Sequence, residues 1–381
     1  MKVEQSNTSV VYGDRFILKL FRRLEAGVNP DLELGRFLTE RAAFAHIPPL
    51  AGVLEYRRQH AEPMTLAILQ GFVPNQGDAW QYTLDALGHY CEGVLARQTA
   101  MPAAPMPPQP LLALLEDEIP PLAYELIGPY LGAARLLGQR TAELHVALAQ
   151  ETDDPAFAPE PFSTLYQRAL YQSMRSPTGQ VFERLLERLQ EVPAAVREEA
   201  QLVVSLEPEI LRRFRSVLQR KITAMRIRIH GDYHLGQVLY TGKDFVIIDF
   251  EGESPRPLSE RRIKRSPLRD VVGMLRSFHY AAYTALSSRI NGGVARPEDM
   301  AVLEPCAHFW HLWVSAVFLK AYLASAAPAP FLPRTREELA ILLDAYVLEK
   351  ALYELGHELD NRPDWVQVPL RGILQLLETR R

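Results

Sequence analysis

The stretch that decides the fold covers residues 228–253 and reads RIHGDYHLGQVLYTGKDFVIIDFEGE. Its two apolar runs at 238–240 and 245–248 are typical of short strands, and the Gly- and Asp-containing segment between them is typical of a turn. We therefore expect a β-hairpin, preceded by a polar loop with two glycines. This arrangement would bring three oxygen-bearing side chains to neighbouring strand ends: Asp232, Gln237 and Asp249.

These side chains suit phosphoryl transfer. The reaction needs a carboxylate that orients and deprotonates an attacking hydroxyl, and oxygen ligands for Mg²⁺ on the nucleotide phosphates. Kinases place a carboxamide ligand five residues after the base and a metal-binding Asp after the next strand pair. Asp232 matches the base, Gln237 and Asp249 match the metal ligands, and His230 would orient the loop. Each half alone also fits an ordinary turn or strand end, so the indication comes from their combination.

The same stretch resembles the aminoglycoside-phosphotransferase-like kinases, in which His-Gly-Asp-x-His-x-Gly-Asn is followed by Ile-Asp-Phe/Trp-Glu. This chain has Gln237 where most members have Asn, and Gln keeps the carboxamide oxygen on a longer arm. HGDYHLGQ followed by DFEGE is most similar to the maltokinases and to the maltokinase-like domain of trehalose synthase fusions. The resemblance implies an α+β, protein-kinase-like two-lobe fold with a mostly helical C-lobe, and ATP and Mg²⁺ as cofactors.

The N-terminal region supplies a candidate for the lysine that kinases place on the α- and β-phosphates of ATP. Residues 8–21 predict a β-hairpin with Lys19 in its second strand. Taken alone, Lys19 is more typical of a solvent-facing strand lysine, but kinases pair such a lysine with a helix glutamate. Asn29-Pro30 predicts a helix start, and Glu33 is the expected partner, with Glu40 as the competitor. Residues before the hairpin would cover the phosphates: Ser6, Asn7 and Thr8.

We expect a truncated β-rich N-lobe over residues 1–72 and a helical C-lobe over 73–381, which carries the catalytic hairpin at 226–250. In a kinase N-lobe the lysine lies on the third strand, and maltokinases also carry an N-terminal cap. Only a few residues precede the hairpin here, so we expect a fragment, an internal start or a domain of a larger fusion. The strand at 64–73 would end at the hinge that binds adenine through its backbone: Gln70, Phe72 and Val73.

A helix predicted at 336–359 carries several polar residues on one face, which is compatible either with a solvated surface or with a sugar site. Maltokinases end with a similar Glu-Lys-Ala-Leu-Tyr-Glu-Leu and Asn-Arg-Pro-x-Trp stretch. The resemblance therefore implies a sugar site here and beside the catalytic stretch. Its expected residues are His234, Glu251, Glu349, Tyr353, Glu354, Asn361, Arg362 and Trp365.

Composition excludes several other classes of protein. The chain has 381 residues and a net charge of −4, which argues against a nucleic-acid binder. It has no apolar run of about 18 residues and no signal peptide at its start, so we expect no membrane span and a cytoplasmic location. The two cysteines, Cys91 and Cys306, give neither a disulfide framework nor a thiolate metal site.

The function implied by the resemblance is ATP-dependent transfer of the γ-phosphate to the C1 hydroxyl of maltose, giving maltose 1-phosphate for trehalose and glycogen metabolism. A trehalose synthase domain or protein would be the partner. Two alternatives stay open. One is a kinase of the same fold that acts on an aminoglycoside, choline or another amino alcohol. The other is a non-catalytic module that positions a partner trehalose synthase.

Overall fold

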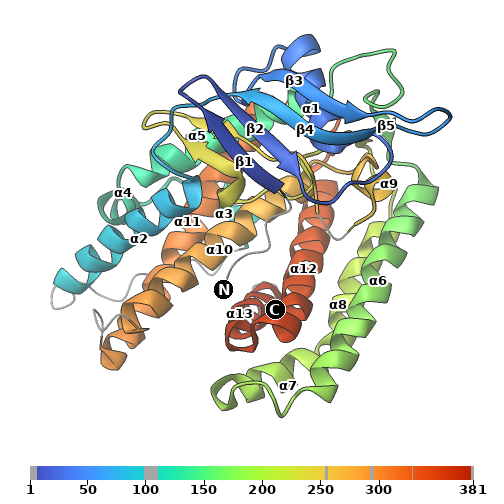
Figure 1. The fold of residues 1–381 in the computed structure, drawn as a ribbon. Helices are drawn as coiled ribbons and strands as arrows, with labels where there is room; N and C mark the ends of the chain where they lie inside the picture. Colours follow the sequence, from blue (N-terminus) through green and yellow to red (C-terminus); the bar gives the residue numbers. More distant parts are fainter. Residues whose placement is uncertain (1–6, 98–109, 254–255, 292–295, 328, 379–381) are drawn as a thin grey trace.

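The computed structural model describes residues 7–97, 110–253, 256–291, 296–327 and 329–378. Its smaller lobe is a four-stranded antiparallel sheet in the order β1-β2-β4-β3, shown at one end of the molecule in Figure 1. The elements of this lobe are β1 (Asn7–Tyr12), β2 (Phe16–Phe21), α1 (Pro30–Arg36), the π-helix η1 (Phe37–Arg41), β3 (Leu50–Tyr56) and β4 (Met64–Gly71).

Helix α1 begins where the sequence predicts. The side chain of Asn29 accepts hydrogen bonds from the N–H groups of Asp31 and Leu32 at 2.8 and 3.3 Å, and Pro30 is the first helical residue. Both features are favourable helix starts, because the cap satisfies N–H groups that have no partner in the first turn and proline needs none. The cap fixes which face of α1 each acidic side chain occupies.

The larger lobe is mostly helical and lies beneath the sheet in Figure 1. Its helices are α2 (Ala79–Ala96), α3 (Leu111–Leu114), α4 (Pro121–Ile127), α5 (Tyr130–Leu148), α6 (Thr164–Glu187), α7 (Arg197–Ser205), α8 (Glu207–Arg215), α9 (Leu258–Arg261), α10 (Leu268–Asn291), α11 (Met300–Ala326), α12 (Arg336–Asn361) and α13 (Gln367–Glu378). Short 3₁₀ segments are η2 (Ala194–Val196), η3 (Ser216–Leu218), η4 (Leu235–Gln237), η5 (Pro297–Asp299) and η6 (Pro363–Trp365). Its strands are β5 (Glu160–Pro161), β6 (Met225–Arg226), β7 (Val238–Tyr240) and β8 (Phe245–Ile247).

The core of the larger lobe is built on α5, α10 and α11. A methyl group at Gly138 of α5 would lie 2.3 Å from the backbone oxygen of Phe318, so the absence of a side chain lets α5 and α11 approach closely. Helix α11 is long and apolar enough to cross a membrane, but 67% of its most apolar window is buried inside the protein. Such burial is typical of a core helix, and Trp310 at its centre is fully buried.

Several elements of the larger lobe depart from regular patterns. Helix α6 continues through Pro177, and the residues after it form η2, α7, α8 and η3 in place of one long helix. Strand β6 pairs with β5 and not with the hairpin. The hairpin itself is formed by β7 and β8, with Val238 opposite Ile247.

Candidate active site

The loop at residues 230–237, which we call the 230–237 loop, is anchored by Asp270 in the first turn of α10. One carboxylate oxygen of Asp270 accepts from the N–H of His230 at 2.8 Å, and the other accepts from the N–H of Gly231 at 2.9 Å. Asp270 is 2% exposed. Its Oδ2 also lies 3.1 Å from Nε2 of His145, whose Nδ1 lies 2.9 Å from the hydroxyl of Tyr322. Asp270 and His145 therefore support the loop structurally.

Close backbone packing adds to this support. A methyl group at Gly273 would lie 2.4 Å from the backbone oxygen of Tyr233, so α10 can lie against the loop only with glycine at this position. The hydroxyl of Tyr233 lies 2.9 Å from that of Thr141 on α5. The loop is thereby fixed to two core helices before any ligand binds.

His230 orients the loop through both ring nitrogens. Its Nε2 lies 2.9 Å from the backbone oxygen of Ile248, and its Nδ1 accepts from the N–H of Asp232 at 3.3 Å. Since Ile248 immediately precedes Asp249, the imidazole joins the two halves of the sequence motif. The side chain of Asp232 is 36% exposed and lines the largest pocket described below. A carboxylate in this position is accessible to an incoming hydroxyl.

The hairpin brings together the two predicted metal ligands. Next to the paired residues of β7 and β8, the N–H of Ile248 donates to the backbone oxygen of Gln237 at 3.0 Å. The side-chain amide of Gln237 lies 3.0 Å from Oδ2 of Asp249. Asp249 has a φ of 67°, in the left-handed region that non-glycine residues seldom adopt. This conformation follows directly on β8.

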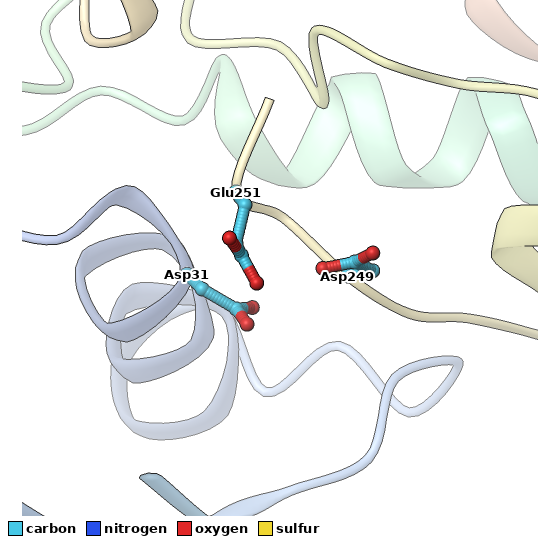
Figure 2. Close-up of side chains that lie close together, drawn as sticks. All are labelled: Asp31, Asp249 and Glu251. Atoms are coloured by element: carbon cyan, nitrogen blue, oxygen red, sulfur yellow. The ribbon is translucent and has the colours of Figure 1, made fainter. Parts of the chain in front are cut away.

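Lys19 of β2 lies at the centre of three carboxylates, which with it form the Lys19 cluster. Its Nζ is 2.7 Å from Asp31 of α1, 2.5 Å from Asp249 and 2.6 Å from Glu251. Ligand oxygens of the three carboxylates lie within 4.8 Å of one another, and Figure 2 shows them converging from α1 and from the segment after β8. Lys19 is buried, which lowers its pKa, but the charges of Asp31, Asp249 and Glu251 outweigh burial and raise it above the ordinary value.

The charges in the Lys19 cluster fit a divalent cation. Three carboxylates and one ammonium group leave a net charge of −2 at a part-buried position. All donors are oxygens, which Mg²⁺ prefers. Burial raises the pKa of Glu251, the charge of Lys19 opposes this, and the neighbouring Asp249 raises it further. Asp249 and Glu251 are the residues that would hold the ion, and Gln237, whose amide nitrogen donates to Asp249 at 3.0 Å, would add its amide oxygen once the amide is turned over.

The prediction that Glu33 pairs with Lys19 is wrong, because Asp31 occupies that position. Residues two apart on an α-helix point to nearly opposite sides, so α1 cannot direct both carboxylates toward β2. Glu33 instead accepts from Arg228 at 2.6 Å and from Arg262 at 2.7 Å. Burial raises the pKa of Glu33, but its hydrogen bonds and attraction to the two arginines outweigh burial and lower it. The competitor, Glu40, lies 3.9 Å from Arg36 at the surface.

Glu33 thus joins three elements of the site. Arg228 lies two residues before His230 and is 1% exposed, whereas Arg262 lies in the segment that follows Asp249. The same helix holds Asp31, whose Oδ1 accepts from the N–H of Phe250 at 3.1 Å. Helix α1 is therefore bound to the loop and to the post-β8 segment through its opposite faces.

Of the three residues expected over the phosphates, one reaches the Lys19 cluster. The side-chain amide of Asn7 lies 3.2 Å from Glu251. Thr8 points the other way, because neighbouring strand residues alternate, and its hydroxyl accepts from Arg22 at 3.0 Å. Ser6 lies outside the described residues, and its role stays a prediction.

The expected hinge residues lie where β4 leaves the sheet. Gln70 is inside β4, opposite Ile17 of β2 and Leu50 of β3. The N–H of Phe72 donates to the backbone oxygen of Arg15 at 2.8 Å, so this group serves the sheet and is not directed at a ligand. The backbone oxygen of Val73 accepts from Asn75 at 2.8 Å. Contacts of Gln70, Phe72 and Val73 with adenine stay predictions.

A pocket of about 710 Å³ opens in front of Asp232, and we call it the Asp232 pocket. Its walls come from α12, α6 and the segment between Asp249 and α10. Three of the predicted sugar-site residues line it at helical spacing along α12: Glu349, Tyr353 and Asn361.

The other predicted sugar-site residues are not among those that line the Asp232 pocket. Glu354 is buried and pairs with Arg276 of α10 at 2.7 Å. Arg362 pairs with Glu358 at 2.6 Å, and its guanidinium lies 5.5 Å from the ring of Trp365. Packing against α10 thus turns Glu354 away from the pocket, whereas sugar binding by Arg362 and Trp365 stays a prediction. His234 accepts from the N–H of Gly236 at 3.1 Å, and Glu251 belongs to the Lys19 cluster.

Residue-level prediction missed several charged groups of this pocket. Glu253 is half-buried: burial raises its pKa, but Lys350 and Arg256 outweigh that effect and lower it. Lys350 lies 4.8 Å from the ring of Tyr353. The repeated acidic pattern Glu251-Gly-Glu253 was the available signal, since its second carboxylate falls just beyond the metal-binding position.

The comparisons with known proteins point to one kind of enzyme. No family model matches the chain. A glucosamine kinase of Streptacidiphilus jiangxiensis is 26% identical over 99% of this chain and 73% of its own length. A glucosamine kinase of Mycolicibacterium smegmatis is 24% identical over 99% of this chain and 78% of its own length.

Solved structures support the fold. A glucosamine kinase structure matches with a TM-score of 0.70 and 23% identity, over 98% of this chain and 76% of that one. A glucosamine kinase in complex with glucosamine, ADP and inorganic phosphate matches with a TM-score of 0.69 and 23% identity, over 97% of this chain and 74% of that one. The prediction of an α+β, protein-kinase-like two-lobe fold with a mostly helical C-lobe is confirmed.

Proposed function

We propose that this chain is an ATP-dependent sugar kinase. The observation that carries the proposal is the position of Asp232. It is held by the anchored loop, linked through His230 to Ile248, the residue before Asp249, and open to a pocket large enough for a sugar. The similarity to two glucosamine kinases over nearly the whole chain supports the same activity. A phosphotransferase needs an acceptor base and a phosphate site side by side, and these residues supply both.

The roles follow from the chemistry of each group. Asp232 receives the proton of the acceptor hydroxyl and holds that hydroxyl in line with the γ-phosphate. Lys19 binds the α- and β-phosphates, and Asp31 keeps its ammonium group in place. Asp249, Glu251 and Gln237 would hold Mg²⁺, which neutralises charge on the phosphates when it is bound. Most of the rate enhancement then comes from positioning and charge neutralisation.

The acceptor we place first is glucosamine, because the curated relatives are named for it. Maltose, phosphorylated at its C1 hydroxyl, is the second candidate. It is favoured by the Glu-Lys-Ala-Leu-Tyr-Glu-Leu stretch of α12, of which Glu349 and Tyr353 line the Asp232 pocket, and by the pocket volume of about 710 Å³. A partnership with trehalose synthase belongs to this second candidate.

The experiment is a coupled ADP-release assay with ATP, Mg²⁺ and a panel of acceptors that includes glucosamine, maltose, an aminoglycoside and an amino alcohol. We expect turnover with a sugar, and ³¹P and ¹H NMR of the product identifies the phosphorylated hydroxyl. Turnover only with the amino alcohol would reject a sugar acceptor. No turnover with any acceptor, together with binding to a trehalose synthase, would support a non-catalytic module instead.

A further inference from the structure

The Asp232 pocket is lined by several cations that the proposed transfer does not use, and Arg265 is one of them. Arg265 lies in the segment between Asp249 and α10 and is half-buried. Its backbone forms an antiparallel bridge with Ile227: its N–H donates at 2.9 Å and its oxygen accepts at 3.0 Å. This bridge fixes Arg265 to the chain that leads into the 230–237 loop, so its position in the pocket wall is determined by the fold.

Neighbouring arginines are neutralised, but Arg265 is not. Arg256 pairs with Glu253 and also lies 3.5 Å from Glu260, and Arg269 pairs with Glu349 at 2.9 Å. Among the residues that the structure describes, no carboxylate lies within ion-pair distance of the Arg265 side chain. Burial lowers the pKa of Arg265, and the nearby Arg269 and Arg256 cations lower it further.

Two other residues carry unsatisfied donors, and one of them, Arg269, also lines the Asp232 pocket. Within the described part of the chain, Nε of Arg269 and the hydroxyl of Tyr166 on α6 are buried and have no hydrogen-bond partner. Arg226, which lies 4.1 Å above the Tyr166 ring, is already paired with Glu160 at 2.6 Å. Buried donors without a partner carry a free-energy cost, which a bound acceptor would remove.

We propose that Arg265 and Arg269, which both line the Asp232 pocket, form an oxyanion-binding recess in its wall. The ligand is a phosphate, sulfate or carboxylate group, which a guanidinium recognises through paired N–H donors. The group is either a substituent of the acceptor sugar or a free anion. Only the first form rests on the proposed kinase function, and it would put an acidic sugar in place of glucosamine as the preferred acceptor.

The first experiment measures sulfate binding by calorimetry and by thermal shift, at constant ionic strength set with chloride. We expect binding to the wild type and a loss of at least tenfold in affinity for Arg265→Ala. Arg184→Ala is the matched control, because Arg184 lines the same pocket but is paired with Asp360 at 2.6 Å. The variant Lys19→Ala tests for sulfate binding at the phosphate site. An unchanged sulfate affinity in this variant supports the recess. Loss of sulfate affinity in Lys19→Ala, together with normal sulfate binding by Arg265→Ala, overturns the recess.

The second experiment distinguishes the two sources of the anion. A neutral hexose, its uronic acid and its sugar phosphate are compared as acceptors for the wild type and for Arg265→Ala. A rise in KM of about tenfold for the anionic acceptors alone assigns the group to the acceptor, whereas sulfate binding without this selectivity assigns a free anion. An equal loss for neutral and anionic acceptors, with sulfate binding unchanged, overturns the recess. If no sugar is phosphorylated at all, the kinase proposal fails, and the sulfate experiment still decides the recess.

Discussion

The 230–237 loop and the Lys19 cluster carry similar chemical groups but are held in different ways. The loop is fixed by a fully paired, buried carboxylate, Asp270, on a core helix of the larger lobe. The Lys19 cluster draws on β2, α1 and the post-β8 segment, and its three carboxylates exceed its one ammonium group. One half is complete within the protein, whereas the other has a surplus of negative charge that a cation would neutralise.

This difference follows from the separate requirements of the catalytic base and of the nucleotide site. A catalytic base must be held in one place before substrate arrives, and a buried, satisfied network does this. A nucleotide site must change its charge when ATP and metal bind, so groups supplied by separate elements suit it better. The largest predicted effects therefore concern the loop, and smaller ones concern the cluster and its supports.

Replacement of the base should have the largest effect. We expect Asp232→Asn to lower kcat by about 10³-fold, because proton transfer to a positioned base contributes roughly this factor. The melting temperature should be unchanged, since Asp232 is partly exposed. Steady-state kinetics and thermal unfolding measure the two quantities, with Asp364→Asn at an exposed position as the control. Near-normal activity in Asp232→Asn would remove the catalytic role from this loop.

Loss of the loop anchor should cost stability as well as activity. In Asp270→Asn, the amide group cannot accept from two backbone N–H groups and His145 together, so a buried donor loses its partner. We expect the free energy of unfolding to fall by about 3 kcal/mol. Chemical denaturation measures it. An effect below about 0.5 kcal/mol would mean that the loop is not the rigid half of the site.

Mg²⁺ should stabilise the protein through the Lys19 cluster. At ten times its dissociation constant, a ligand that binds only the native state adds about 1.4 kcal/mol. We expect this gain for the wild type and its loss in Asp249→Asn, because Asn tolerates a positive φ but lacks the charge. Thermal unfolding with Mg²⁺ and with EDTA measures it. Equal stabilisation of both proteins would place the ion elsewhere.

Glu33 should act on nucleotide binding through the position of α1. In Glu33→Gln the paired Arg228 and Arg262 lose their counter-charge, and the face of α1 that carries Asp31 is less firmly held. We expect KM for ATP to rise about fivefold, or roughly 1 kcal/mol, with a smaller change in kcat. Glu40→Gln is the matched control on the same segment. A fall in kcat with KM for ATP unchanged would show that α1 does not position Lys19.

The smallest effect should appear as a pH dependence. Burial raises the pKa of Asp270. Other effects outweigh burial and lower this pKa: the hydrogen bond and charge of His145, the charge of His230 and the hydrogen bond from the N–H of Gly231. A carboxylate whose pKa is lowered in the native state stabilises the fold at pH values above its unfolded-state pKa, which is about 3.9. This stabilisation is lost as the pH falls below that pKa. Stability of the wild type should therefore decline more steeply below about pH 4 than that of Asp270→Asn, as measured by urea denaturation at each pH.

Much of this organisation could be predicted from the sequence, because it depends on local patterns. The hairpin spacing indicated that Gln237 and Asp249 meet, and the cap at Asn29 indicated where α1 begins. The partner of Lys19 could not be chosen in the same way. Asp31 and Glu33 are both acidic and both in the first turn, and only the rotation of α1 against the sheet decides between them.

The sugar-site residues show the same limit. Glu349 and Glu354 are five positions apart on α12, and packing against α10 turns the second away from the pocket to Arg276. The unpaired Arg265 had no local signal, since a run of basic residues is also typical of a solvated loop. Whether such a residue is neutralised depends on carboxylates from distant segments.

The left-handed backbone of Asp249 has a consequence for the history and engineering of this protein. A residue other than glycine in this conformation costs on the order of 1 kcal/mol or more. Glycine at position 249 would relieve this strain, but it would also remove the ion pair with the buried Lys19 and the acceptor of the Gln237 amide. Strain and ion pair therefore have opposite effects on stability, and a screen for robust variants must include turnover to retain this aspartate.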